Sequence, residues 1–247
     1  MRLTHALFFA WAMVAAMQLE AREAAPSAIR MTLSPYVRIE YQVTWGEGGL
    51  VVGTVVQESR HDATHYSMRN TAETTGLARL LKHATVVTVS EGDIVAGGLR
   101  PRQFRIERSS GKNESASLDW QSNRVSLSNG RQFELVPGTQ DMLSLFVQLP
   151  LLDTGGSTVS IPVITTKKID AYVFVLVGRE KIATPRGERD TLHFRHREPD
   201  SKEATEIWIG LDDARLPIKI RHVDRRGGVF DQLAVRIEFE ETREGTR

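Results

Sequence analysis

The sequence predicts a mainly β protein: a large curved antiparallel sheet or open β-barrel with two short helices packed on it. Three observations lead to this fold class. Apolar residues recur at every second position in most segments, clusters of Gly, Asn, Asp, Ser and Pro separate these segments, and only two stretches show helical spacing. Because a twisted sheet of many strands tends to curl on itself, we expect a single β-rich domain over residues 30–242, with one candidate hinge at 151–157.

The first two strands are expected to form a hairpin. In Tyr36–Trp45, Val37 and Ile39 alternate with charged residues, which gives one buried and one solvated face. A glycine-rich turn then leads into the valine-rich segment Leu50–Glu58. Further strands are predicted at Thr64–Thr74, Thr85–Ser90, Asp93–Ala96, Gln103–Arg108, Ala116–Trp120, Arg124–Ser128, Gln132–Val136, Thr158–Thr165, Lys168–Val177, Arg189–Arg197, Glu206–Gly210, Pro217–Asp224 and Phe230–Glu240.

Two stretches favour helices instead. Gly76–His83 has leucines at helical spacing and predicts a short helix. In Gln140–Leu149 the apolar residues fall mostly on one broad face, and Pro150 ends the run. We expect the apolar face of this second helix to lie on the sheet.

Residues 1–21 match a secretory signal peptide. Arg2 precedes an apolar run at Ala6–Met17, which is shorter than the roughly 20 residues that a membrane-spanning helix needs. An apolar helix packed on the core is the alternative. The expectation is a periplasmic protein with no transmembrane anchor, and the absence of cysteine from the sequence excludes a lipid-modified N-terminal cysteine.

Composition narrows the chemistry further. The formal charge of +1 gives no global field that would gather nucleic acid. Without cysteine there are no disulfides, thiolate zinc sites or cysteine nucleophiles. His193 and His196 lie three apart on a predicted strand, so they should face opposite sides and cannot chelate one metal. No metal, cofactor or nucleic acid is therefore expected.

No catalytic residue is assigned. Asp141, at the start of the second predicted helix, fits a capping role, in which a carboxylate accepts backbone N–H bonds. Ser144 has no histidine placed to activate it, and the G-x-S-x-G motif of many hydrolases is absent from the sequence. Asp119 and the pair Asp212 and Asp213 fit turns better than paired catalytic carboxylates.

Large aromatic residues give the better hypothesis for a binding site. Under the alternation they should face inward, where core packing is the simplest interpretation. An open barrel of this size can also keep an apolar cavity between sheet and helix. The candidate ligand-binding residues are Trp45, Trp120, Phe104, Gln140, Asp141, Phe146 and Trp208.

Several short islands stand out along the chain: Tyr41-Gln42-Val43 with Trp45, Thr75-Gly76-Leu77 with Leu80-Leu81, Ser90-Glu91-Gly92, Gly98-Leu99-Arg100-Pro101 with Phe104, Leu118-Asp119-Trp120, and Gln140-Asp141-Met142-Leu143-Ser144. Taken in this order, they resemble a proteobacterial exported family known only as domain of unknown function 3108. The resemblance runs from about Tyr36 to Glu240 and implies secretion and a β-rich fold, but no activity.

A second resemblance covers only the last hairpin. Glu206–Asp213, followed by Leu216–Ile220, is similar to the closing hairpin of periplasmic lipoprotein carriers of the LolA and LolB type. Those proteins are open β-barrels that hold acyl chains, so the resemblance implies a fold by analogy.

The first functional hypothesis is a non-enzymatic protein of the bacterial envelope. It would bind a lipid or other hydrophobic small molecule in the hollow under Gln140–Leu149. The alternative is a structural or assembly partner of an envelope protein, acting through a sheet edge or a surface patch. A hydrolase of envelope polymers is the third and least favoured hypothesis.

Overall fold

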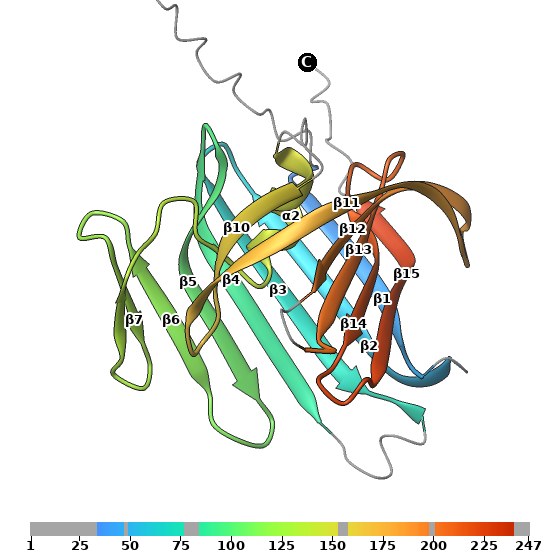
Figure 1. Cartoon of the computed structure of the whole chain (residues 1–247), viewed down its shortest axis with the longest axis horizontal. Coiled ribbons are helices and arrows are strands. Elements are labelled where there is room, and N and C mark those ends of the chain that lie inside the picture. The colour runs from blue at the N-terminus through green and yellow to red at the C-terminus, as the bar shows by residue number, and fades with distance from the viewer. Residues whose placement is uncertain (1–33, 47–48, 77–83, 153–157, 198–200, 240–247) are drawn as a thin grey trace, which may run out of the picture.

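One 15-stranded sheet forms the body of the molecule (Figure 1). The computed structural model describes residues 34–46, 49–76, 84–152, 158–197 and 201–239. The expected signal peptide, all but the first residue of the helix expected at Gly76–His83, and most of the candidate hinge lie outside these residues. The strand order is β8-β7-β6-β5-β4-β3-β2-β1-β15-β14-β13-β12-β11-β10-β9.

Nearly all neighbouring strands follow each other in the sequence and pair antiparallel. The first half of the chain supplies β1 to β8, and the second half supplies β9 to β15, with β1 beside β15 joining the halves. The bounds are β1 Tyr36–Trp45, β2 Leu50–His61, β3 His65–Thr74, β4 Thr85–Val95, β5 Gly98–Arg108, β6 Glu114–Asp119, β7 Arg124–Leu127, β8 Gln132–Glu134, β9 Gln140–Asp141, β10 Thr158–Ile164, β11 Ile169–Thr184, β12 Gly187–Arg197, β13 Ala204–Gly210, β14 Pro217–Val223 and β15 Val229–Phe239.

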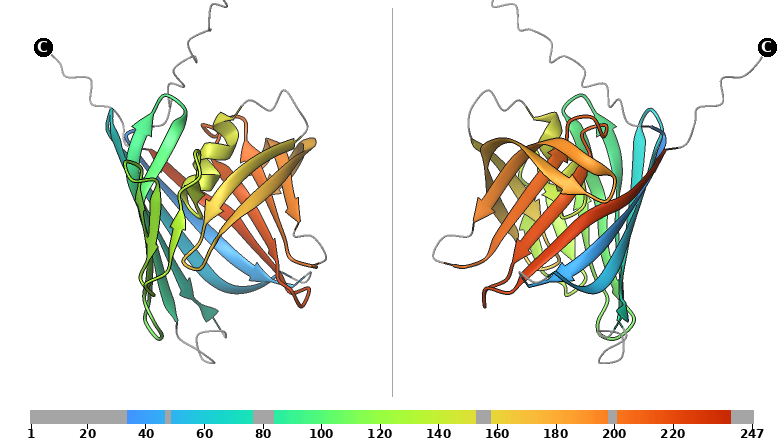
Figure 2. Two further views of the ribbon diagram at one scale, coloured as in Figure 1. Left: turned by 60° about the vertical axis from the view of Figure 1, so that its left-hand side comes forward. Right: turned by 90° about the vertical axis from the view of Figure 1, so that its right-hand side faces the viewer.

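The sheet curls into a barrel-like wall without closing, since its end strands β8 and β9 are not paired with each other in the described residues (Figure 2). This confirms the predicted mainly β class and open curved sheet. The strand β4 runs unbroken where two strands were expected, because Gly92 carries a register shift inside it. A Cβ at Gly92 would lie 2.3 Å from the Arg100 carbonyl oxygen, so the bulge requires glycine.

The second predicted helix is shorter than expected. Gln140 and Asp141 form the strand β9, which pairs parallel with β10, and the α-helix α2 covers only Ser144–Gln148. A 3₁₀ turn, η1, follows at Leu149–Leu151. The crossover from β9 through α2 to β10 is what a parallel pair requires. α2 is the one α-helix that lies wholly within the described residues, and no helix there is long and apolar enough to cross a bilayer.

The helix α2 lies between two walls of the curled sheet rather than on one. Leu143 and Val147 pack in a cluster with residues of β3 to β7, such as Phe104. Leu145 and Leu149 pack in a second cluster with β10 to β13, including Phe194. The segment 140–152 thus packs apolar side chains against both walls and connects the two core clusters.

Candidate functional site

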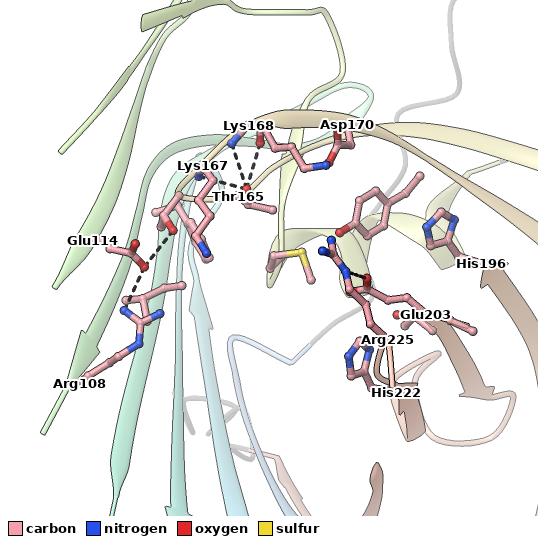
Figure 3. Close-up of a pocket in the computed structure, with 17 residues that line it drawn as sticks. Arg108, Glu114, Thr165, Lys167, Lys168, Asp170, His196, Glu203, His222 and Arg225 are labelled. Atoms are coloured by element: carbon pink, nitrogen blue, oxygen red, sulfur yellow. Dashed lines mark hydrogen bonds and ion pairs between the residues drawn. The ribbon is translucent and has the colours of Figure 1, made fainter. Parts of the chain in front are cut away.

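A cavity of about 390 Å³ opens where the β10–β11 turn meets the ends of β5, β13 and β14 (Figure 3). We call it the mouth cavity. Its apolar lining comes from Phe104 and Ile106 on β5, Met142 before α2, and Tyr172 on β11. Its rim is charged and comes mostly from turns. Its volume lies near the lower end of the range for small-molecule sites, roughly 300–1,000 Å³. Its lining is part apolar and part polar.

The turn above the mouth cavity is fixed by a threonine. The Thr165 hydroxyl accepts hydrogen bonds from the backbone N–H groups of Lys167, at 3.1 Å, and Lys168, at 3.2 Å. The Thr165 N–H in turn donates to the Lys168 carbonyl at 2.9 Å. This side-chain turn carries both lysines to the rim.

Three of the basic rim residues are paired with carboxylates. Arg108 lies 3.0 Å from Glu114, Lys168 lies 2.6 Å from Asp170, and Arg225 lies 2.9 Å from Glu203. Lys167, the fourth, has no carboxylate oxygen within 4.0 Å among the described residues. The rim therefore carries more positive than negative charge.

His196 on β12 lies in the wall of this cavity with only 5% of its surface exposed. Its ring stacks on Tyr172 with centroids 4.5 Å apart and planes 9° apart. The Nδ1 atom lies 3.1 Å from the Val173 carbonyl oxygen, which can only accept, so Nδ1 carries the proton. The Nε2 atom is buried and has no hydrogen-bond partner in the described residues.

A second cavity, also about 390 Å³, lies between β5 and the segment 140–152. We call it the seam cavity. Here side chains of the segment 140–152 bind the backbone of β5 and of the turn before it. Gln148 accepts from the Leu99 N–H at 2.8 Å and donates to the Gly97 carbonyl at 2.8 Å. Gln140 donates to the Leu99 carbonyl at 2.8 Å, and its Oε1 atom is buried without a partner in the described structure.

Asp141 is fully buried behind these glutamines. Its Oδ1 accepts the N–H groups of Leu143 and Ser144, at 2.8 and 2.9 Å. Asp141 thus binds backbone N–H groups as predicted, but it ends β9, and the N-cap residue of α2 is Leu143, which has no side-chain cap. Its Oδ2 accepts from Ser90 on β4 at 2.5 Å, and Ser90 lies 3.1 Å from the Tyr66 hydroxyl. Burial raises the pKa of the Asp141 carboxyl, while the hydrogen bonds from Ser90 and the backbone act to lower it.

This cluster does not supply an activated nucleophile. The Ser144 hydroxyl accepts from the Asp141 N–H at 2.9 Å, and no histidine is among the hydrogen-bond partners of either residue in the described part of the chain. Asp119 accepts N–H groups from Gln121 and Ser122, as a turn residue does. In the same part of the chain, no three His, Asp or Glu residues gather as metal ligands would.

The structure divides the residues that the sequence singled out. Phe104 lines the mouth cavity, and Trp120 and Gln140 line the seam cavity. Phe146 packs at the edge of the core cluster that contains Leu145. Asp141 belongs to the segment 140–152, which contributes residues to both cavities. It is itself buried and is not among the described residues that line either cavity.

Two aromatic residues do not face inward as expected. Trp45 is 50% exposed, because the register of β1 against β2 shifts between Val43 and Thr44 and ends the alternation. Trp208 points to the outer face, since its neighbours Ile207 and Ile209 fill the inner core.

On the outer face Trp208 belongs to a polar cluster. His193 stacks on it with centroids 4.2 Å apart, and the Lys219 ammonium lies 4.6 Å from its ring centroid. The His193 ring also lies 2.7 Å from the Glu206 carboxylate. His193 and His196 thus face opposite sides of β12, as their spacing predicted.

The sequence analysis missed Tyr172, His196 and Lys167 as site residues. The alternation contained a signal for two of them. Tyr172 shares its strand face with Phe174, and His196 shares its face with Phe194, both of which are buried. The signal for Lys167 was weaker, since only the fold brings the β10–β11 turn over the cavity.

Comparison with known proteins gives a family and a fold. The family model described as "Protein of unknown function (DUF3108)" matches residues 40–233. No curated protein matches the chain. A crystal structure described as a "Beta-barrel-like Protein of Domain of Unknown Function DUF1849 from Brucella abortus" is similar with a TM-score of 0.53 and 12% identity. The match covers 85% of this chain and 99% of that one, and at this identity it shows the fold alone.

Proposed function

Because the chain belongs to the DUF3108 family of proteins of unknown function, we propose a function from the geometry of its cavities. It is a non-enzymatic binding protein of the bacterial envelope that holds one small amphipathic molecule in the mouth cavity. The signal-like segment at residues 1–21 supports export to the periplasm.

One observation carries the proposal: the mouth cavity combines apolar side chains, such as those of Phe104, Ile106 and Met142, with a charged rim. Covering apolar side chains with an apolar ligand is favourable, and a few polar groups at the edge of a pocket fix the ligand's orientation. A ligand with an apolar body and a polar group would cover these three side chains and place its polar group at the rim. The volume of about 390 Å³ fits one chain or ring system rather than a lipid with several chains.

The test is binding of N-phenyl-1-naphthylamine, a neutral dye that fluoresces in apolar surroundings. We expect saturable binding to the wild type and at least tenfold weaker binding to Ile106→Trp, which fills the cavity. The matched control is Val175→Trp, on the exposed face of β11, where Val175 is 44% exposed. Equal binding by all three proteins would place the dye elsewhere and refute the mouth cavity as the site.

A second candidate function, an assembly partner, rests on a different surface. Val173, Val175 and Val177 on the outer face of β11 are 43–49% exposed, and exposed apolar stripes often mark protein contacts. Val175→Arg would then remove an envelope partner captured by cross-linking, while leaving dye binding unchanged. Loss of dye binding in this variant, with the cross-link intact, would speak against that second function.

A further inference from the structure

We propose that the molecule in the mouth cavity carries an anionic head group, a carboxylate or a phosphate, that binds beside Lys167. This inference rests on the proposed function and deepens it, because it assigns the charge of the ligand and the end of the cavity where that charge lies.

The first step is the charge balance of the rim. Arg108, Lys168 and Arg225 each have a carboxylate partner at 3.0 Å or less. Each of these pairs has no net charge as a unit. The pairs therefore do not decide the sign of the ligand.

The second step is the charge that remains. Lys167 has no carboxylate within 4.0 Å in the described part of the chain, and it lies on the turn that roofs the cavity. Figure 3 shows its side chain extending from this turn toward the hollow, away from the paired Lys168 and Asp170. His222 also lies at the rim, and a histidine side chain is never negative, so it does not neutralise the positive charge of Lys167.

The third step is a neighbouring cation. The Arg131 guanidinium donates to the Lys167 carbonyl at 3.2 Å and lies 4.9 Å from the Phe133 ring centroid. It too has no carboxylate within 4.0 Å in the described residues. Arg131 is not among the residues that line the mouth cavity, but it adds a positive charge next to the turn that carries Lys167, which favours an anion there at low ionic strength.

The fourth step is the direction of the ligand. The apolar lining comes from β5, β11 and the residue before α2, whereas Lys167 lies on the β10–β11 turn; the apolar residues are Phe104, Ile106, Met142 and Tyr172. An amphipathic ligand would place its apolar part against these side chains and its head group at the turn. A cationic head group would meet the positive charge of Lys167 instead of a counter-charge.

The experiment displaces N-phenyl-1-naphthylamine with single-chain C12 compounds below their micelle concentrations, in low salt. The compounds are dodecanoate, dodecyl phosphate, dodecanol and dodecyltrimethylammonium, with inorganic phosphate alone as a further arm. We expect the two anions to bind roughly tenfold more tightly than dodecanol and the cation more weakly, as expected for unscreened charges at close range. Displacement by inorganic phosphate alone would show a free anion site and overturn the amphipathic ligand.

Lys167→Met and Lys167→Glu test the residue. Methionine keeps most of the apolar length and removes the charge. We expect Lys167→Met to weaken the binding of the two anions roughly three- to tenfold and Lys167→Glu to weaken it more, while the affinity for dodecanol stays unchanged. For the wild type, added salt should reduce the difference in affinity between the anions and dodecanol. The matched control, Lys181→Met, changes an exposed lysine of β11 that does not line the cavity.

The two proposals fail in different ways. If the dye and dodecanol bind in the cavity but the anions bind no better than dodecanol, the head-group inference is wrong and the binding function stands. The same holds if Lys167→Met behaves like Lys181→Met. If neither the dye nor any C12 compound binds the wild type, both proposals are overturned.

Discussion

Ser90 and Asp141 connect two strands that the sheet does not pair: the Ser90 hydroxyl on β4 donates a 2.5 Å hydrogen bond to the buried Asp141 carboxyl on β9. The strands β4 and β9 are far apart in the strand order, and no backbone ladder connects them among the described residues. With the hydrogen bonds of Gln140 and Gln148, this contact ties the segment 140–152 to β4 and β5 through side chains rather than through a backbone ladder. The mouth cavity is lined by Met142 of the same segment and so lies next to this contact.

Asp141→Ala is expected to destabilise the protein by about 2–4 kcal/mol, because it leaves the Ser90 hydroxyl and the N–H groups of Leu143 and Ser144 without their acceptor. Urea unfolding monitored by fluorescence measures this. The matched control is Asp119→Ala, an exposed turn aspartate, which should cause a much smaller loss. Equal losses in the two variants would mean that the buried hydrogen bonds contribute nothing beyond an ordinary turn.

The same carboxyl should make stability depend on pH. Burial raises its pKa in the folded protein, so the folded state holds the proton more tightly than the unfolded chain does. Its contribution is then complete below the unfolded value, about 3.9, and is lost as the pH rises through the raised folded pKa. The unfolding free energy of wild type minus that of Asp141→Asn should fall as the pH increases from about 4. A difference that is flat or grows with pH would contradict this.

Gly98→Ala should loosen the seam. Gly98 has a φ of +112°, and a Cβ there would lie 2.2 Å from the Gln148 Oε1 atom that accepts from Leu99. We expect a loss of roughly 1–3 kcal/mol and faster hydrogen exchange of the Leu99 amide. The adjacent Gly97→Ala is the control, because its Cβ would meet nothing within 4 Å. Unchanged Leu99 exchange in Gly98→Ala would show that Gln148 does not protect this amide.

Trp208→Leu should lower stability by about 2–4 kcal/mol while leaving dye binding unchanged. The substitution removes the ring that stacks on His193 and lies under Lys219, both on the outer face. Urea unfolding and a dye titration on one preparation separate the two effects. Trp45→Leu, at a half-exposed tryptophan, should change neither. Weaker dye binding in Trp208→Leu would return Trp208 to the inner, ligand-facing side.

Most strands could be predicted from the sequence because alternation is a local signal. Val37, Ile39 and Tyr41 are all buried, as the period of two requires. The alternation failed at Trp45, where a register shift changes which face a residue takes. At Trp208 the alternation was applied to the wrong face. Ile207 and Ile209 lie on the inner face, so Trp208 between them lies on the outer face, and the size of its ring does not change this.

The site was harder to predict, because it depends on contacts between distant segments. The helical spacing in 140–149 was correct for Ser144–Gln148, but nothing local shows that Gln140 and Asp141 pair with β10. The approach of Gln148 to Leu99, and of Lys167 to the mouth cavity, follows from the curl of the whole sheet. Residue types alone therefore gave Phe104, Trp120 and Gln140 as cavity residues, and missed the rim.

A crystal structure of the protein grown with dodecanoate tests the central claim most directly. The account predicts one chain along Phe104, Ile106 and Met142 in the mouth cavity, with its carboxylate beside Lys167. Density for the chain in the seam cavity or on the outer face, with only ordered water in the mouth cavity, would contradict it.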